Sequence, residues 1–383
     1  MTAMTEEQER LCEMVRNFAR SEVAPVAAQA ERNERFPPEL LGRMAELGLL
    51  GGQVPVEWGG QGLDHQTYAM VIEEMARVDH IAALYMSMPS SLVGRGLRQF
   101  GTDEQRERWL RPLAGGRIFG AAAVTEPRSG SDVGGLTTTY RKVGSQYVLN
   151  GSKAWISNLE LADFVLTFAT RDRSLRYDGI SAFIIPRDTP GLGLHPYKDK
   201  LGFRSMVTGD ISIDDVELNP DCLLGAEGEG FAIAMSSVES GRLSVAARAL
   251  GGSWACLDES IRYAKSRELF GETLDSFQLT KAKLTEMAMG INAARMLIGG
   301  AAKILDDGGP ARAALSMAKL YASDLFQRSA TEAVQIHGAY GTSADYRVSR
   351  LYRDAKVFQL VEGGNEVHRL LIADTLLGRR RER

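Results

Sequence analysis

Glu362 is the acidic side chain whose surroundings best suit proton transfer. It lies between an apolar run ending at Val361 and the flexible pair Gly363-Gly364. An apolar pocket disfavours the charged form of a carboxyl group, so the pKa rises toward neutral pH and the group becomes a better base. The same residues also allow a purely structural interpretation, in which Glu362 is an acid preceding a helix over 366–377 that Asn365 or the glycines cap.

Residues 122–132, with the sequence AAVTEPRSGSD, form a second segment with chemical potential. An apolar stretch runs into a turn of small polar residues, which exposes backbone N–H groups and hydroxyls. Such donors suit a phosphate or the polar edge of a planar ring, because small residues let the backbone approach closely. An ordinary strand followed by a capped turn gives the same pattern.

Residues 151–158, with the sequence GSKAWISN, form a third segment. Trp155 and Ser157 alternate, so a strand would place an aromatic plane and a hydrogen-bond donor on one face, as a flavin ring requires. Trp155 could equally pack in the core.

The elements that must position these segments fall into three parts. Residues 1–119 have helical periodicity, with Leu11, Val15 and Phe18 at helix spacing. Residues 120–229 contain short apolar or alternating runs, such as 164–168 and 180–185, separated by turn residues, which is typical of a β-barrel or sandwich.

From residue 230 onward the sequence predicts long helices. One apolar stripe has spacings of three and four and comprises Leu284, Met287, Ile291, Ala294 and Ile298. A second helix is predicted from about residue 311 to 336, after the break at 306–310, so neighbouring helices should pack antiparallel as a bundle. The fold class expected is therefore α+β in three regions.

Composition excludes several other classes of protein. A chain of 383 residues suits two or three packed regions, since single cores stop growing near ~250 residues. The formal net charge of -4 argues against nucleic acid as the main partner. Cys12, Cys222 and Cys256 form no CxxC pair, so we expect neither a disulfide framework nor a metal site. Acids at the amino terminus and the lack of ~18 consecutive apolar residues predict a cytoplasmic protein without membrane spans.

The ordered set of motifs resembles the acyl-CoA dehydrogenase family. Besides the three segments above, the match includes the loop 55–62 and the segments 200–202, 241–242, 335–341, 350–356 and 362–363. Each motif is weak alone, but the order is specific. The resemblance implies an N-terminal all-α domain, a middle β-domain and a C-terminal four-helix bundle. It also implies an FAD-dependent enzyme that α,β-dehydrogenates an acyl thioester, with Glu362 removing the α-proton and flavin N5 accepting the β-hydride.

The resemblance further assigns residues to the cofactor and substrate. The flavin side would be contacted by Ala122, Val124, Thr125, Gly130, Ser131, Trp155, Ile156 and Ser157, with Gly364 and Glu366 at the turn of the base. The ADP half, contributed across a dimer interface, would be held by Arg267, Phe270, Gln278, Gln335, Ile336, Gly338 and Ala339. The substrate would meet Ser131, Glu239, Arg242 and Gly363. Without the resemblance, we would interpret Arg267 as a solvent-exposed charge on a helix and Gly338 as the residue that ends a helix.

The family also implies partners and an alternative place for the base. The expected partners are an acyl-CoA or acyl carrier protein thioester, an electron-transferring flavoprotein and further copies of the chain in a homotetramer. Some members carry the base immediately before the arginine of the 241–242 motif. Here that position is Gly241, and Glu239 should face another side of its helix. Glu362 is therefore the expected base.

The chain also departs from the family pattern. Val361 and Gly364 replace a tyrosine and a threonine that usually flank the Glu-Gly pair, and Arg128 and Ala339 replace glycines. These changes affect the acyl pocket and the grip on the cofactor. Two alternatives stay open: a flavin monooxygenase or nitrososynthase on the same fold, and a non-catalytic scaffold.

Overall fold

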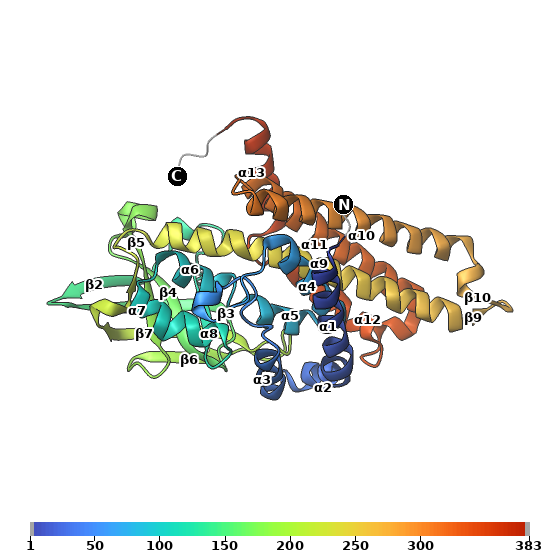
Figure 1. The fold of residues 1–383 in the computed structure, drawn as a ribbon, viewed down its shortest axis with the longest axis horizontal. Helices are drawn as coiled ribbons and strands as arrows, with labels where there is room; N and C mark the ends of the chain where they lie inside the picture. Colours follow the sequence, from blue (N-terminus) through green and yellow to red (C-terminus); the bar gives the residue numbers. More distant parts are fainter. Residues whose placement is uncertain (1–3, 380–383) are drawn as a thin grey trace.

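A computed structural model describes residues 4–379, and Figure 1 shows its three parts along one long axis. The first three residues of the amino-terminal segment that argued against a signal peptide lie outside this range. The helices of the first part are α1 (Glu6–Phe18), α2 (Ala24–Asn33), α3 (Pro38–Glu46), α4 (His65–Val78), α5 (His80–Ser87), α6 (Leu92–Phe100), α7 (Asp103–Gln105) and α8 (Arg111–Ala114). Thr5 caps α1, and the predicted core positions Val15 and Phe18 are buried.

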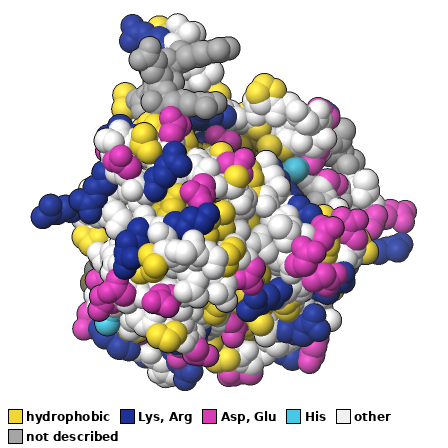
Figure 2. Space-filling view, turned by 90° about the vertical axis from the view of Figure 1, so that its left-hand side faces the viewer, with side chains coloured by type: hydrophobic (Ala, Val, Ile, Leu, Met, Phe, Trp, Pro, Cys, Tyr) yellow, Lys and Arg dark blue, Asp and Glu magenta, His cyan; other side chains and the backbone are white. Residues whose placement is uncertain are grey.

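The middle part is one eight-stranded sheet. Its strands are β1 (Phe119–Ala123), β2 (Thr139–Val143), β3 (Gln146–Ser157), β4 (Ala162–Thr170), β5 (Ile180–Pro186), β6 (Leu192–Pro196), β7 (Thr208–Leu218) and β8 (Leu223–Leu224). The order is β6-β7-β3-β2-β4-β5-β8, with β1 parallel to β4. β4 is buried on both faces because Leu166 and Phe168 meet a core shared with α6, whereas Val165 meets a second core. Figure 2 shows acidic and basic side chains interspersed over this end of the molecule.

The last part is a helical bundle. It contains α9 (Gly230–Ser266), α10 (Gln278–Asp306), α11 (Arg312–His337), α12 (Arg347–Phe358) and α13 (Asn365–Leu376), with a hairpin of β9 (Glu268–Leu269) and β10 (Glu272–Thr273) after α9. The α10 stripe is buried as predicted at Met287, Ile291, Ala294 and Ile298, and Leu284 is partly buried. α9 starts beside the sheet and runs toward the hairpin at the other end (Figure 1), so it links the middle part to the bundle.

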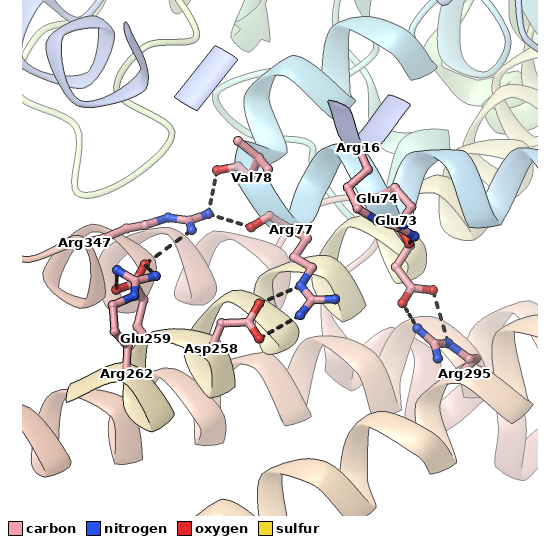
Figure 3. Close-up of polar contacts among 10 residues, drawn as sticks. All are labelled: Arg16, Glu73, Glu74, Arg77, Val78, Asp258, Glu259, Arg262, Arg295 and Arg347. Carbon is pink, nitrogen blue, oxygen red and sulfur yellow. Dashed lines mark hydrogen bonds and ion pairs between the residues drawn. The ribbon is translucent and has the colours of Figure 1, made fainter. Parts of the chain in front are cut away.

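Ion pairs join α4 to the bundle, as Figure 3 shows. Arg77 donates to both carboxylate oxygens of Asp258 on α9, at 2.6 and 2.7 Å. Glu73 accepts from Arg295 on α10, and Arg347 on α12 donates to two carbonyl oxygens at the end of α4, at 2.8 and 2.5 Å. The helical parts are thus held against each other around α9. Within residues 4–379, no helix is both long and apolar enough to cross a bilayer.

Candidate active site

Glu362 lies on the tight turn between α12 and α13. Its φ of 53° and the φ of 94° at Gly363 are both left-handed, a conformation that costs a non-glycine residue of order 1 kcal/mol and concentrates at functional sites. The turn directs the side chain onto α9. A methyl group at Gly241 would lie 2.8 Å from Cδ of Glu362 and 2.9 Å from its Oε2. The carboxyl group therefore occupies the space that the missing side chain of Gly241 leaves.

Three cationic groups surround this carboxyl group. Burial raises the pKa of Glu362 to about 7, although Arg248, Arg242 and Lys319 oppose that rise. Arg242 and Arg248 are both nearly inaccessible, at 4% and 2% exposure. A carboxyl group with a pKa near neutrality can accept a proton at physiological pH and hold it. The alternative that Glu362 only precedes a helix does not account for the packing of its carboxyl group on α9, and its role as the base stays a prediction.

A buried polar network holds the turn. Lys319 on α11 donates to the carbonyl oxygen of Gly363 at 2.8 Å and to Oδ1 of Asn365 at 2.9 Å. Asn365 in turn donates to Ser323 at 3.0 Å. The ring nitrogen Nε2 of His368 lies 3.2 Å from the carbonyl oxygen of Glu362. Burial lowers the pKa of His368 to about 3, so the ring is neutral and donates from Nε2. Sequence reasoning missed this network.

Glu239, which lies one turn before Arg242 on α9, lines a cavity of about 520 Å³. The Glu239 carboxylate lies 3.3 Å from Arg312 and 4.0 Å from Arg242. It is therefore paired with two arginine side chains, which makes it a poor candidate for a second base. The cavity lies between α6, α9 and the start of α11, and its lining includes Arg95, Gln99, Phe100, Ser236, Glu239 and Arg312. Its size falls in the range of small-ligand sites. Of the predicted substrate residues, Glu239 thus lines the cavity, and Arg242 lies one turn further along α9, next to Gly241, which touches the base.

Trp155 is exposed, so the alternative that it packs in the core is wrong. Its side chain is 63% accessible, and its φ is 59°. The pairing of β3 with β7 shifts register between Lys153 and Ile156, and this bulge turns the indole outward to lie 4.8 Å from the ring of Tyr197. Ile156 is buried in the sheet core at 2% exposure, which leaves only its backbone for a cofactor. Ser157 is partly buried on the same strand.

A buried ion pair joins the two polar segments of the middle part. Lys153 Nζ lies 2.8 Å from Oε1 of Glu126, and both side chains are fully inaccessible. Glu126 also accepts from the backbone N–H groups of Thr137 and Thr138, at 2.5 and 2.9 Å. Burial raises the pKa of Glu126, but Lys153 and these hydrogen bonds outweigh that effect and lower the pKa to about 2. The loop carrying Ser131 is thereby fixed against β3.

The loop itself is presented for contact. Thr125 accepts from the N–H of Ala154 at 2.9 Å, so the two segments also share a backbone hydrogen bond. Gly130 and Ser131 are exposed at the tip, and Ala122 and Val124 are partly buried beneath it. Exposed backbone donors beside an exposed indole fit the planar ring and phosphates of a flavin nucleotide.

The residues expected to hold the ADP half lie elsewhere. Phe270 is 90% exposed at the tip of the β9–β10 hairpin, with Arg267 and Gln278 exposed on either side. The Arg267 guanidinium lies 5.9 Å from the ring centre of Tyr340, which places the segment after α11 beside the hairpin. Gln335, Gly338 and Ala339 are exposed there, and Ile336 is buried. This cluster and the sheet occupy opposite ends of one chain in Figure 1. One chain therefore does not bring the two predicted halves of the cofactor site together.

Comparison with known proteins agrees with this architecture. Three family models match: "Acyl-CoA dehydrogenase, N-terminal domain" over residues 5–117, the middle domain over 121–216 and the C-terminal domain over 228–377. An acyl-CoA dehydrogenase of Bacillus subtilis is 42% identical over 375 residues, covering 98% of this chain and 99% of the relative. A 3-(aryl)acrylate reductase of Clostridium sporogenes is 38% identical, covering 97% and 99%.

Solved structures of acyl-CoA dehydrogenases and related enzymes have the same fold as this chain. Butyryl-CoA dehydrogenase from Megasphaera elsdenii superposes with a TM-score of 0.95 at 37% identity, covering 98% of this chain and 100% of the other. A prolyl acyl carrier protein oxidase superposes with a TM-score of 0.94 at 34% identity. With three family models matched along its length and relatives of 37–42% identity covered from end to end, the chain belongs to the acyl-CoA dehydrogenase family of FAD-dependent oxidoreductases acting on acyl thioesters.

Proposed function

We propose that the chain α,β-dehydrogenates its acyl thioester with Glu362 as the base that removes the α-proton. The carrying observation is the placement of its carboxyl group against Gly241 on α9, next in sequence to Glu239 and Ser240, which line the cavity. FAD, when bound, accepts the hydride from the β-carbon. The chain supplies the rest: Glu362 holds the abstracted proton, and the cations around it favour the negative charge that develops on the thioester oxygen.

The backbone N–H of Glu362 is a further donor for that oxygen. It has no hydrogen-bond partner among residues 4–379, because the left-handed turn removes it from the ladder of α12. A free N–H beside the base suits the developing enolate oxygen, since preorganised donors aimed at a growing charge are among the strongest catalytic contributions. The left-handed backbone conformation at Glu362 is then the energetic cost of placing its carboxyl group and its N–H on the same substrate.

We also propose that two chains complete each FAD site. The flavin segment around Trp155 and the cluster around Arg267 are both exposed and lie at opposite ends of one chain, so an antiparallel partner could bring one of each together. A guanidinium offers a planar fork for pyrophosphate, and the turn at Gly338 exposes backbone donors. Ala122, Val124, Thr125, Gly130, Ser131 and Ser157 would bind on the flavin side, with Gly364 and Glu366 at the turn of the base.

Pairs of such dimers would form a homotetramer through α10. Its outer face exposes Leu279, Met289 and Met296 at 78%, 63% and 65%, and apolar side chains of this kind on one helix mark interaction surfaces. An electron-transferring flavoprotein is the proposed electron acceptor. Support comes from a subunit of a caffeyl-CoA reductase–Etf complex of Acetobacterium woodii, which is 38% identical over 374 residues.

An anaerobic titration of the purified yellow protein with acyl-CoA and acyl carrier protein thioesters tests the proposed reaction. We expect bleaching of the flavin absorbance with formation of the 2,3-unsaturated thioester, and the better of the two carriers identifies the natural one. Reduction by neither carrier, together with oxygen-dependent hydroxylation, would instead support the monooxygenase alternative. A colourless protein unable to bind FAD would support the scaffold.

A further inference from the structure

Arg248 is a buried cation with two donor nitrogens that have no hydrogen-bond partner among residues 4–379. Its side chain is 2% exposed, and neither Nε nor Nη1 has a hydrogen-bond acceptor within the described part of the chain. The guanidinium carbon lies 5.3 Å from the ring centre of Phe358, a contact that leaves the in-plane N–H donors free. A buried charge without hydrogen bonds is costly, so a protein retains one where a ligand supplies the missing acceptors.

The position of Arg248 on α9 places this cation beyond the base. Gly241, which touches Glu362, and Arg248 are seven residues apart on α9 and therefore share one face, about 10 Å apart along the axis. Helical side chains tilt back toward the N-terminus, which brings the guanidinium to about 5 Å beyond the level of Glu362. The cavity at Glu239 lies on the opposite side, before Gly241. Along α9 the order is therefore the cavity at Glu239, the base Glu362 at Gly241, and the guanidinium of Arg248.

We propose that Arg248 binds a carboxylate at the far end of the acyl chain, so that the substrate is a short ω-carboxyacyl thioester. The inference rests on the proposed function, which puts Cα beside Glu362, and it takes the cavity lined by Glu239 as the place of the thioester carrier. For a carboxylate that lies beside the guanidinium at the same level along α9, about 5 Å beyond Cα corresponds to roughly three to four carbon–carbon bonds, which gives an acyl chain of five to six carbons including the terminal carboxylate.

The local charges favour an anionic ligand. Arg242, Arg248 and Lys319 all act on the single carboxyl group of Glu362, and once that group takes up the α-proton the cations are left in excess. The planar guanidinium can bind a carboxylate through two parallel N–H donors. The hydroxyl of Tyr68 lies in the same buried region, where it donates a long hydrogen bond of 3.5 Å to the carbonyl oxygen of Ser87 and also interacts with Ser90.

A competing role for Arg248 is to stabilise the charge of Glu362. Among the ion pairs of residues 4–379 there is none within 4.0 Å between these two side chains, so any effect of Arg248 on Glu362 must act through space. That role would change the proton affinity of the base equally for every substrate. A carboxylate-binding role changes the preference between substrates that differ only at the chain end, and this difference separates the two.

The test compares matched thioesters that end in a methyl or a carboxylate group: pentanoyl-CoA with glutaryl-CoA, and hexanoyl-CoA with adipyl-CoA. The wild-type enzyme should favour the carboxylate member in kcat/KM by at least ~100-fold, because the methyl analogue leaves a buried cation unpaired. Arg248→Met should lose at least ~100-fold more on the carboxylate member than on the methyl member, and Arg248→Lys should recover part of that difference. Arg16→Met, which removes a cation from a surface pair with Glu74, is the charge-matched control.

Binding without turnover gives an independent readout. In the Glu362→Gln variant, calorimetry should give a tighter Kd for adipyl-CoA than for hexanoyl-CoA, and adding Arg248→Met should abolish that difference. A preference of the wild-type enzyme for methyl-ended chains, or an equal loss on both members in Arg248→Met, would overturn the inference. If no thioester reduces the flavin, the proposed function fails by itself, and the two Kd values still decide the role of Arg248.

Discussion

Replacing Gly241 by alanine tests whether the space beside α9 holds the base. The added methyl carbon would lie 2.8 Å from Cδ of Glu362, whereas carbon atoms in contact are about 3.5–4.0 Å apart, so the carboxyl group must move by about 1 Å. A displacement of that size can cost about 100-fold in rate, or about 2.7 kcal/mol. Alanine inside a helix is favoured over glycine by about 0.5–1 kcal/mol, and the clash involves the end of a flexible side chain, so the fold should tolerate the change.

The measurement is the rate of anaerobic flavin reduction by a saturating thioester, alongside thermal unfolding of the same variant. We expect a rate about 100-fold lower and an unfolding temperature that does not fall. Gly42→Ala in α3 is the matched control, because no described atom lies within 4 Å of its added methyl group. Its rate of flavin reduction and its unfolding temperature should stay the same or rise slightly. A Gly241→Ala enzyme with a rate within a few-fold of wild type would refute the placement of the base.

The remaining predictions concern pH, stability and the cofactor. Because Glu362 acts as a base and its pKa is about 7, kcat/KM should rise with pH through about 7 and then level off; a flat profile from pH 5 to 9 would contradict this. Glu126→Gln should destabilise the fold by roughly 3 kcal/mol in denaturant unfolding, since it leaves Lys153 buried and unpaired. In the wild type the pKa of Glu126 is about 2 in the folded state and ~4 in the unfolded state. The stability that its charge contributes is therefore present above ~pH 4 and is lost as the pH falls toward 2. The Glu126→Gln variant should not show this loss. Arg267→Ala should weaken FAD binding by at least ~10-fold in fluorescence titration and shift the assembly toward smaller species in ultracentrifugation, while leaving the far-UV circular dichroism unchanged.

The pattern of apolar residues predicted the broad architecture because periodicity is a local property. The α10 stripe and the buried run of β4 followed from spacing alone. The role of Glu362 was inferred from its apolar neighbours combined with the family resemblance, and it stays a prediction. The orientation of Trp155 did not follow from the residues, since strand alternation leaves either face open. A bulge in the pairing with β7 decides it, and register across strands is a tertiary property.

The groups that support the site were missed for a different reason. Lys319, Arg248 and Lys153 each interrupt an otherwise apolar pattern, and Lys319 lies on the same helix face as the buried Leu315 and Phe326. A charged residue in such a stripe signals a buried partner or ligand, but the sequence does not name the partner. Here the partner of Lys319 is a backbone carbonyl 44 positions away, which only the fold brings near.

Substituting glutamine for Glu362 examines the proton acceptor itself while nearly preserving shape. We expect the variant to remain yellow and to bind the thioester with a similar Kd, because neither depends on accepting a proton. Its flavin should be reduced at least ~100-fold more slowly in rapid-mixing absorbance measurements, the scale of a lost general base. Reduction of the Glu362→Gln flavin at the wild-type rate would show that another group takes the α-proton, and the account of this site would be wrong.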